Sequence, residues 1–182
     1  GHGGAGAFYP SNSRDALLAG IRLGVDRIEF DLMMAAGNQL VLVHNRKYSD
    51  EDGRVHKTAT TPVSVLRQIL PGFLTFDEAV EITKGRVPLL LDVKVPGFEH
   101  VLIESIRRHG IERDIHISCT NPRTIKRLRA AFPEMPIGLS TGHRPTSGAL
   151  IGGRWIGGKI LRAIGPVPLL IAMSWCGANE IM

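Results

Sequence analysis

Cysteine, aromatic residues and long apolar runs are all scarce in this sequence. Among its 182 residues only Cys119 and Cys176 carry a thiol, too few for a disulfide framework, so we expect a reducing, cytoplasmic setting. No apolar run reaches the roughly 18 residues that a membrane span needs. No secretory signal is visible, although Gly1 in place of Met leaves room for a missing upstream piece. These absences argue against a disulfide-rich secreted domain and predict no transmembrane segment.

Aromatic residues make up only 5% of the chain, and its charge is positive, with a net value of +5 at pH 7 and a pI of about 9.6. This balance favours anionic partners, which include nucleic acid, anionic lipid surfaces and phosphorylated small molecules. Because the Lys and Arg residues are scattered and few aromatic rings can stack on bases, we expect no nucleic-acid partner. We interpret the charge as a bias toward small phosphate-bearing molecules.

What the chain does contain is a regular alternation of apolar strands with helical segments. Its composition, 43% hydrophobic and 21% charged, suits one globular domain over residues 1–182. Such alternation is typical of βαβ units around a parallel sheet, so we predict an α/β fold, with 46–61 as a loop. The predicted strands are 25–32, 40–43, 88–93, 114–118, 137–140 and 169–174. The predicted helices are 13–24, 62–69, 75–82, 99–108, 122–131 and 154–163.

Two carboxylates, Glu29 and Asp31, lie two residues apart in the first predicted strand. Residues i and i+2 of a strand point to the same face, so both carboxylates project together. Burying them unpaired would be costly, and a divalent cation would remove their repulsion. The alternative is that one carboxylate faces solvent while the other forms a salt bridge, for example with Arg27. This strand alone does not decide between the two.

A second pair with the same spacing, Asp92 and Lys94, ends another apolar strand. Alone, this acid and base would simply pair with each other. Together with Glu29 and Asp31, however, Asp92 gives three acids at the C-terminal ends of strands, where parallel barrels place their active sites. Oxygen ligands of this kind suit one divalent cation, Mg²⁺ or Ca²⁺, better than zinc.

Two histidines accompany these acids along the chain. His2 lies in a Gly-rich opening, and His44 follows the apolar stretch 40–43. A lone histidine is usually structural, but two histidines beside a carboxylate–metal cluster could give one proton and take another near neutral pH. The remaining histidines have no supporting context and receive no role; they are His56, His100, His109, His116 and His143.

The order and spacing of these motifs over about residues 1–142 resemble the glycerophosphodiester phosphodiesterase family. Its N-terminal signature runs His-Arg-Gly, Pro-Glu-Asn, Gly-Ala-Asp-x-Ile-Glu-x-Asp and Val-x-His-Asp. This chain has matching segments at 2–4, 10–12, 24–31 and 41–45. Residues 74–79 resemble the family's Pro-Thr-Leu-Glu-Glu segment, and Leu91-Asp92-Val93-Lys94 resembles its Ile-Glu-Ile-Lys strand.

The resemblance implies a TIM-type barrel that hydrolyses a small glycerophosphodiester to an alcohol and glycerol phosphate. It also implies roles for the residues already singled out. Glu29, Asp31 and Asp92 would bind one divalent cation, His2 and His44 would be the acid–base pair, and Lys94 would face the substrate phosphate. The alternatives are a phospholipase D-like activity on sphingomyelin or lysophospholipid, and a non-catalytic phosphate-binding or assembly protein derived from this fold.

The chain departs from the family's pattern at four positions. Gly3 replaces an Arg, Ser11 a Glu, Asn45 an Asp, and Asp92 the more usual Glu, the last as in the related sphingomyelinase D-like phospholipases.

The sequence predicts about six strands, whereas a complete barrel of this type has eight. The closing strands of the barrel are therefore missing from the predicted set. We therefore expect an incomplete barrel, with interior positions such as Leu90 and Ile117 lacking a covering layer. Either the unpaired edge of the open sheet drives self-association, or the chain is part of a longer protein.

Overall fold

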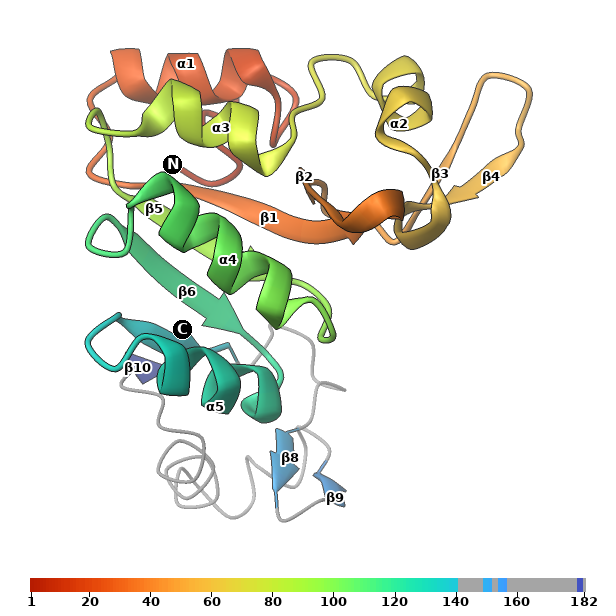
Figure 1. Ribbon diagram of the computed structural model, residues 1–182. Helices are drawn as coiled ribbons and strands as arrows, with labels where there is room; N and C mark the ends of the chain where they lie inside the picture. The colour runs from red at the N-terminus through yellow and green to blue at the C-terminus, as the bar shows by residue number, and fades with distance from the viewer. Residues whose placement is uncertain (141–148, 152–153, 157–179, 182) are drawn as a thin grey trace.

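The computed structural model describes residues 1–140, 149–151, 154–156 and 180–181 (Figure 1). Within these residues a main sheet of six strands is accompanied by two separate two-stranded hairpins. The main sheet consists of β1 (Ile28–Ala35), β2 (Gln39–Leu42), β5 (Leu89–Val93), β6 (Ile115–Cys119), β7 (Ile137–Leu139) and β10 (Glu180–Ile181). The hairpins are β3 (Lys47–Ser49) with β4 (Val55–Lys57), and β8 (Ala149–Ile151) with β9 (Arg154–Ile156).

The described part of the chain also contains five α-helices and two short 3₁₀ turns. The helices are α1 (Arg14–Arg22), α2 (Val63–Ile69), α3 (Phe76–Thr83), α4 (Glu99–His109) and α5 (Pro122–Ala131). The 3₁₀ turns are η1 (Ala36–Asn38) and η2 (Thr58–Thr60). No helix among the described residues has the length and apolar character that crossing a membrane requires.

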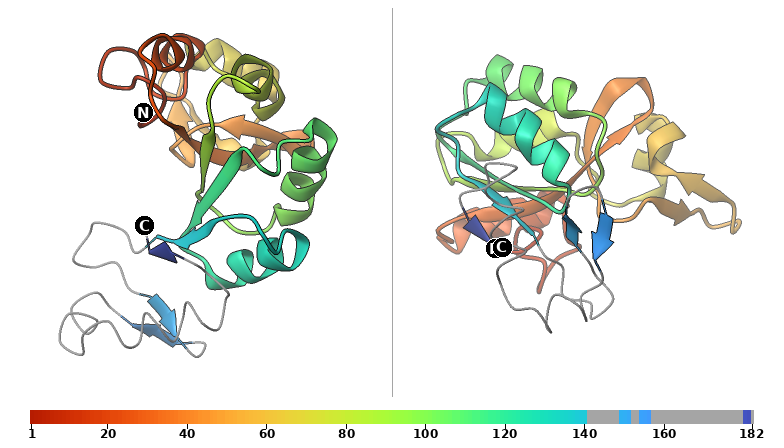
Figure 2. Two further views of the ribbon diagram at one scale, coloured as in Figure 1. Left: turned by 90° about the vertical axis from the view of Figure 1, so that its left-hand side faces the viewer. Right: turned by 90° about the horizontal axis from the view of Figure 1, so that it is seen from below.

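The main sheet has the strand order β10-β7-β6-β5-β1-β2. Every neighbouring pair in it is parallel except β1 with β2. Neighbouring parallel strands need a crossover connection, and Figure 2 shows α4 and α5, in green and teal, together on one side of the sheet. The described strands thus form an open portion of a β/α barrel, which confirms the predicted fold class.

Alternate residues of the strands face the helices and form the core. In β5, Leu89 and Leu91 are buried in the cluster between sheet and helices, whereas Leu90 and Asp92 on the other face stay partly exposed. Ile117 of β6 is fully buried in that cluster. The prediction that Ile117 lacks a covering layer is therefore wrong, because strand residues alternate between faces and this one points toward the helices.

Helix boundaries follow signals between near neighbours in the sequence. The Ser13 hydroxyl accepts a hydrogen bond from the Ala16 amide (3.2 Å) ahead of α1, and Thr75 and Glu78 form the predicted capping box at α3. Helix α4 ends at Gly110, whose φ of 61° lies in the left-handed region that glycine adopts without strain. Helix α5 has the predicted bounds.

The structure corrects several predicted segments. Residues 46–61, predicted as a loop, contain the β3–β4 hairpin and η2. Strand β1 extends to Ala35, beyond the predicted end, and Gly37 with φ 72° then turns the chain back into β2. Because β2 is antiparallel to β1, this apolar strand is the return arm of a hairpin and not a parallel barrel strand.

Near the C-terminal end the sequence pattern is wrong at 154–156, which form β9 and not the start of a helix. The rest of that predicted helix and the predicted strand 169–174 lie outside the described residues. The pattern also misses β10, which pairs in parallel with β7. Three-residue and two-residue strands carry too little periodicity to be recognised from sequence.

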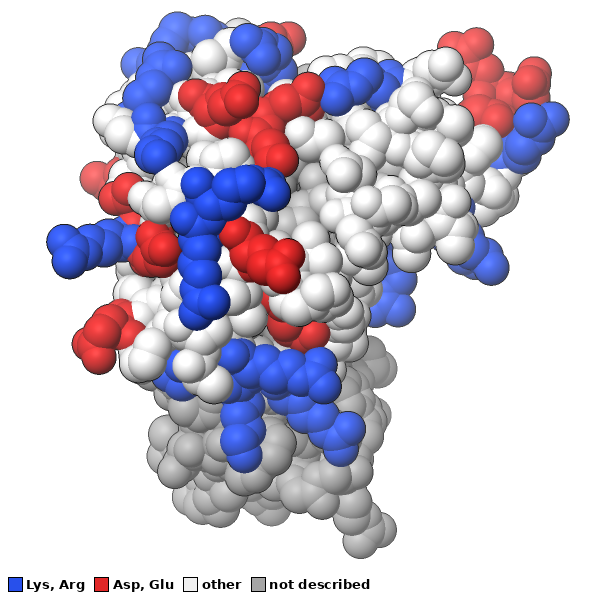
Figure 3. Space-filling model, in the orientation of Figure 1, with Lys and Arg blue, Asp and Glu red and all other residues white. Residues whose placement is uncertain are grey.

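Charged side chains are unevenly distributed on the face shown in Figure 3. Acidic and basic residues mix over α3 and α4, while basic ones gather over α5. Helix α5 contributes Arg123, Lys126, Arg127 and Arg129 and no acid. Arg127 pairs with Glu99 (3.2 Å) and Arg129 donates to backbone carbonyls, so part of this charge fastens the helix to its neighbours.

A polar cluster around Asp77 joins α3 to α4. The Asp77 carboxylate accepts hydrogen bonds from Arg108 (2.7 and 2.9 Å) and Ser105 (3.2 Å), and its Oδ1 lies 2.8 Å from Nε2 of His109. Burial on its own would raise the pKa of Asp77, but the hydrogen bonds from His109 and Arg108 outweigh it and lower the pKa. Asp77 therefore stabilises the fold in its ionised form.

We expect Asp77→Asn to lower the free energy of unfolding at pH 7 by about 1 kcal/mol, a modest loss because the 51% exposed side chain is screened by solvent. Since folding lowers the pKa of Asp77 below its ordinary value of 3.8, the contribution is complete above pH 3.8 and is lost as pH falls through the folded pKa. Urea unfolding at pH 7 and pH 3 measures the difference. Glu81→Gln, on the same helix, is the control, and a loss undiminished at pH 3 would contradict this account.

Candidate active site

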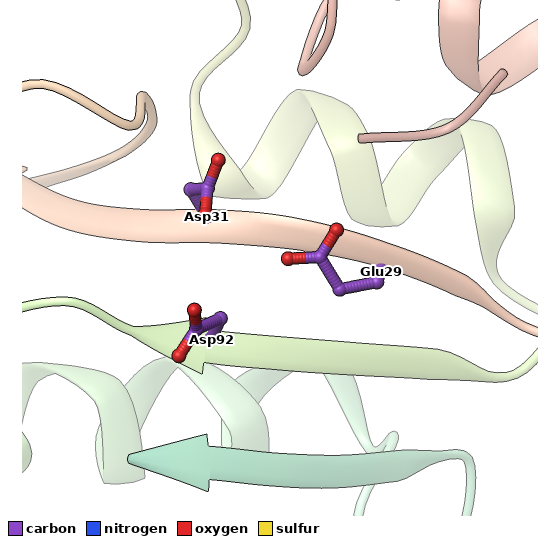
Figure 4. A group of neighbouring side chains, drawn as sticks. All are labelled: Glu29, Asp31 and Asp92. Atoms are coloured by element: carbon purple, nitrogen blue, oxygen red, sulfur yellow. The ribbon is translucent and has the colours of Figure 1, made fainter. Parts of the chain in front are cut away.

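Three carboxylates converge on two neighbouring strands of the main sheet (Figure 4). Glu29 and Asp31 come from β1 and Asp92 from β5, with Asp31 directly opposite Asp92 in the parallel register. One oxygen from each side chain lies within 4.8 Å of the others. The i, i+2 spacing predicts that Glu29 and Asp31 share a face, and the pairing of β1 with β5 brings Asp92 beside them.

The N-terminal segment holds two of these carboxylates in place. Oε2 of Glu29 accepts a hydrogen bond from the Gly3 amide (2.8 Å). Asn12 donates from its side-chain nitrogen to Oδ2 of Asp31 (2.8 Å) and accepts from the Asp31 amide (3.0 Å). Asn12 is buried, with a φ of 65° that Asn adopts more readily than most residues. This paired contact fixes the orientation of Asp31.

Lys94 lies between the carboxylates of two strands. Its Nζ is 2.7 Å from Oδ1 of Asp31 and 2.5 Å from Oδ2 of Asp92. Burial alone would lower the pKa of Lys94, but its interactions with Asp31 and Asp92 outweigh burial and raise the pKa. The ammonium group is therefore a charge partner for both acids, and the simple Asp92–Lys94 pair considered from the sequence forms only part of the arrangement.

Negative charge remains in excess at this cluster. Three carboxylates face one ammonium, and burial, followed by repulsion from Asp31 and Asp92, raises the pKa of Glu29 despite the hydrogen bond from Gly3. Oδ1 of Asp31 is buried and accepts no hydrogen bond from the described residues, although it lies 2.7 Å from Nζ of Lys94. A divalent cation bound by hard oxygen ligands would satisfy both features. The donor set therefore fits Mg²⁺ or Ca²⁺.

The two histidines singled out from the sequence both border this region. The His2 side chain is 83% exposed, and its Nδ1 lies 2.9 Å from Oε2 of Glu29. His44 is exposed two residues after the end of β2, with Nδ1 2.9 Å from the side-chain oxygen of Asn45. His44 also lines a cleft to which Asn12, the partner of Asp31, contributes. That the two rings face each other across a phosphate-sized gap stays a prediction.

Most of the other histidines make structural contacts. His56 pairs with Asp50 (2.8 Å), His109 contacts Asp77, and His116 Nε2 lies 3.2 Å from Nη2 of Arg27. His100 is exposed on α4, and His143 lies outside the described residues.

Sequence reasoning missed two residues next to the site. Asn12 belongs to the Pro10-Ser11-Asn12 segment, but its hydrogen bond to Asp31 joins residues that are 19 positions apart in the sequence, so no local pattern predicts it. Tyr48 accepts a hydrogen bond from the Asn45 amide (3.0 Å), and burial, with a contribution from the charge of Asp31, raises its pKa. No local pattern marks Tyr48, because its place depends on the β3–β4 hairpin.

The backbone conformation at Gly3 is unfavourable for the Arg of the family pattern. Gly3 has a φ of 56°, and a Cβ built on it would lie 2.6 Å from Cβ of Ser11. An Arg at this position would need both an unfavourable backbone conformation and a shift of Ser11. The loss of the Arg is thus accommodated by the local structure, and Gly3 instead contributes its amide to Glu29.

Comparison with known proteins identifies the family of this chain. The sequence model of the glycerophosphoryl diester phosphodiesterase family matches residues 2–159, most of the chain. A glycerophosphodiester phosphodiesterase from Caldanaerobacter subterraneus subsp. tengcongensis is 25% identical over 161 residues, covering 76% of this chain and 64% of the relative. The chain thus spans less than two thirds of that relative's length.

Solved structures share the fold. A glycerophosphodiester phosphodiesterase from Agrobacterium tumefaciens str. C58 superposes with a TM-score of 0.68 at 17% identity, covering 99% of this chain and 84% of that one. An Oleispira antarctica phosphodiesterase, solved in complex with sn-glycerol-3-phosphate, has a TM-score of 0.67 at 18% identity, covering 100% and 82%. On the match of the family's sequence model over residues 2–159, this chain belongs to the glycerophosphoryl diester phosphodiesterase family.

Proposed function

We propose that the protein hydrolyses glycerophosphodiesters to an alcohol and glycerol phosphate, with a divalent cation held by Glu29, Asp31 and Asp92. The observation that carries this proposal is the convergence of the three carboxylates within 4.8 Å on the neighbouring parallel strands β1 and β5, in a chain of this family. The sn-glycerol-3-phosphate bound to the Oleispira antarctica phosphodiesterase, which shares the fold, supports a substrate of this class.

The residues beside the three carboxylates would each have a separate role in the reaction. When bound, Mg²⁺ or Ca²⁺ supplies Lewis-acid stabilisation of a phosphate oxygen. Lys94, already positively charged beside Asp31 and Asp92, would donate a hydrogen bond to the phosphate and stabilise charge that grows in the transition state. Asn12 would keep Asp31 in the orientation that binding requires.

His2 and His44 would move the two protons of the reaction. One imidazole takes the proton of the nucleophilic hydroxyl as its oxygen bonds to phosphorus. The other histidine, in its imidazolium form, gives a proton to the alkoxide that leaves as the bond between phosphorus and the ester oxygen breaks. The contact between His2 Nδ1 and Glu29 would orient that ring.

Metal removal tests the proposal directly. We expect release of glycerol phosphate from a glycerophosphodiester to stop in EDTA and to return when Mg²⁺ or Ca²⁺ is added in excess. Enzymatic measurement of glycerol phosphate and of the free alcohol identifies the bond that is cleaved. Turnover unaffected by EDTA would rule out metal dependence, and no turnover with either metal would favour a non-catalytic phosphate-binding protein. Sphingomyelin and lysophospholipid are offered as separate substrates, and cleavage of either in place of the glycerophosphodiester would indicate the phospholipase D-like alternative.

A further inference from the structure

A cleft of about 190 Å³ opens beside His44. Asn12 forms part of its lining, and the same side chain donates to Asp31 (2.8 Å), so the cleft borders the carboxylate cluster. The loop that follows α2 supplies apolar side chains to the lining. These are Leu70, Pro71 and Phe73.

Among the described residues the lining of this cleft contains no Asp, Glu, Lys or Arg, and its one imidazole is that of His44. Its polar groups are largely engaged, since the Tyr48 hydroxyl accepts from the Asn45 amide and the Asn12 side chain is paired with Asp31 on both of its polar atoms. A charged headgroup placed here would lose water without gaining an ion partner from the lining, which is costly. An apolar segment has no hydrogen bonds to water to give up, and the burial of its surface in the cleft is favourable.

We propose that this cleft selects glycerophosphodiesters whose alcohol is uncharged and carries a short apolar segment, in preference to those with a charged alcohol such as choline. The inference rests on the proposed function. In this proposal His44 is the acid that protonates the leaving ester oxygen, which places the alcohol of that ester at the mouth of the cleft that His44 lines. The alcohol's methylene groups then contact Leu70 and Phe73.

Turnover of a matched series of esters gives the first test. Metal-dependent kcat/KM is measured for glycerophosphodiesters of methanol, butanol and choline. A buried methylene group is worth about fourfold in binding, so partial burial of the butyl chain should favour the butyl ester over the methyl ester by tenfold or more. We expect the butyl ester to exceed the choline ester by at least a similar factor.

A variant that fills the cleft gives the second test. Leu70 is only partly buried at the end of α2, and it packs against a core cluster that includes Leu66 and Phe73. Leu70→Trp therefore enlarges a side chain of the lining, and its unfolding transition is measured beside the wild type to show that the fold is kept. We expect it to reduce the butyl-to-methyl ratio to about one. Val55→Trp is the matched control, because Val55 is 60% exposed on β4, outside the cleft lining, and should keep the wild-type ratio.

Direct binding separates failure of this inference from failure of the proposed function. The affinities of butyl phosphate and phosphocholine for the protein are measured by calorimetry, with no turnover required. Tighter binding of butyl phosphate, lost in Leu70→Trp, supports the cleft's selectivity even if no ester is hydrolysed. Turnover with equal or better use of the choline ester overturns the inference and leaves the proposed function standing. Absence of both turnover and binding preference overturns both.

Discussion

Replacing His44 by alanine is expected to lower kcat for glycerophosphodiester hydrolysis by roughly 10²–10⁴, the usual contribution of a general acid or base. His44 is exposed after β2, and among the described residues its ring forms a hydrogen bond only with the neighbouring Asn45, so the fold should tolerate its removal. The loss should appear mainly in kcat, because a proton-transfer group acts in the transition state more than in substrate binding.

His100→Ala is the matched control for this experiment. His100 is exposed on α4, and we assign it no role. Both variants are compared with the wild type in metal-replete buffer, together with their unfolding transitions. Unchanged turnover in His44→Ala would mean that the two-histidine mechanism is wrong. An equal loss in both variants would point to a general defect of the preparation.

Asp31→Asn is expected to weaken binding of Mg²⁺ or Ca²⁺ by a factor of about 100 or more and to abolish turnover. Asp31 is the most buried of the three acids, at 3% exposure, and stands between Asn12 and Lys94. Both of its oxygens face donors, one the Asn12 amide and the other the Lys94 ammonium. An asparagine amide cannot avoid placing its NH₂ group against one of them, so the metal-free variant should also lose about 1–3 kcal/mol of stability.

Calorimetric titration with Mg²⁺ and Ca²⁺ measures the affinity, and urea unfolding in EDTA measures the stability. Asp26→Asn provides the control, because Asp26 is an exposed residue just ahead of β1. A variant Asp31→Asn that binds the ion as tightly as the wild type would show that this cluster is not the metal site. Loss of stability without loss of affinity would assign Asp31 a purely structural role.

The sequence was informative wherever the interactions involve near neighbours. The alternation of Glu29 with Asp31 depends only on the two-residue period of a strand, and the Thr75–Glu78 capping box depends on a spacing of three. The order of motifs likewise pointed to the family that the comparison with known proteins supports. These features survive in any chain with the same local pattern, which is why they can be predicted without coordinates.

Only the tertiary structure decided which distant residues meet. The pairing of β1 with β5 sets Asp92 opposite Asp31, Lys94 then lies between both, and Asn12 reaches Asp31 from 19 residues away. The same holds for the antiparallel return of β2 and for the face on which Ile117 is buried. Residue type and spacing determined the main apolar strands, the capped helix ends and the acids that share a face. The charge balance at those acids came from strand order and side-chain packing, because electrostatic and hydrogen-bond partners are fixed by distance in space and not by separation along the chain.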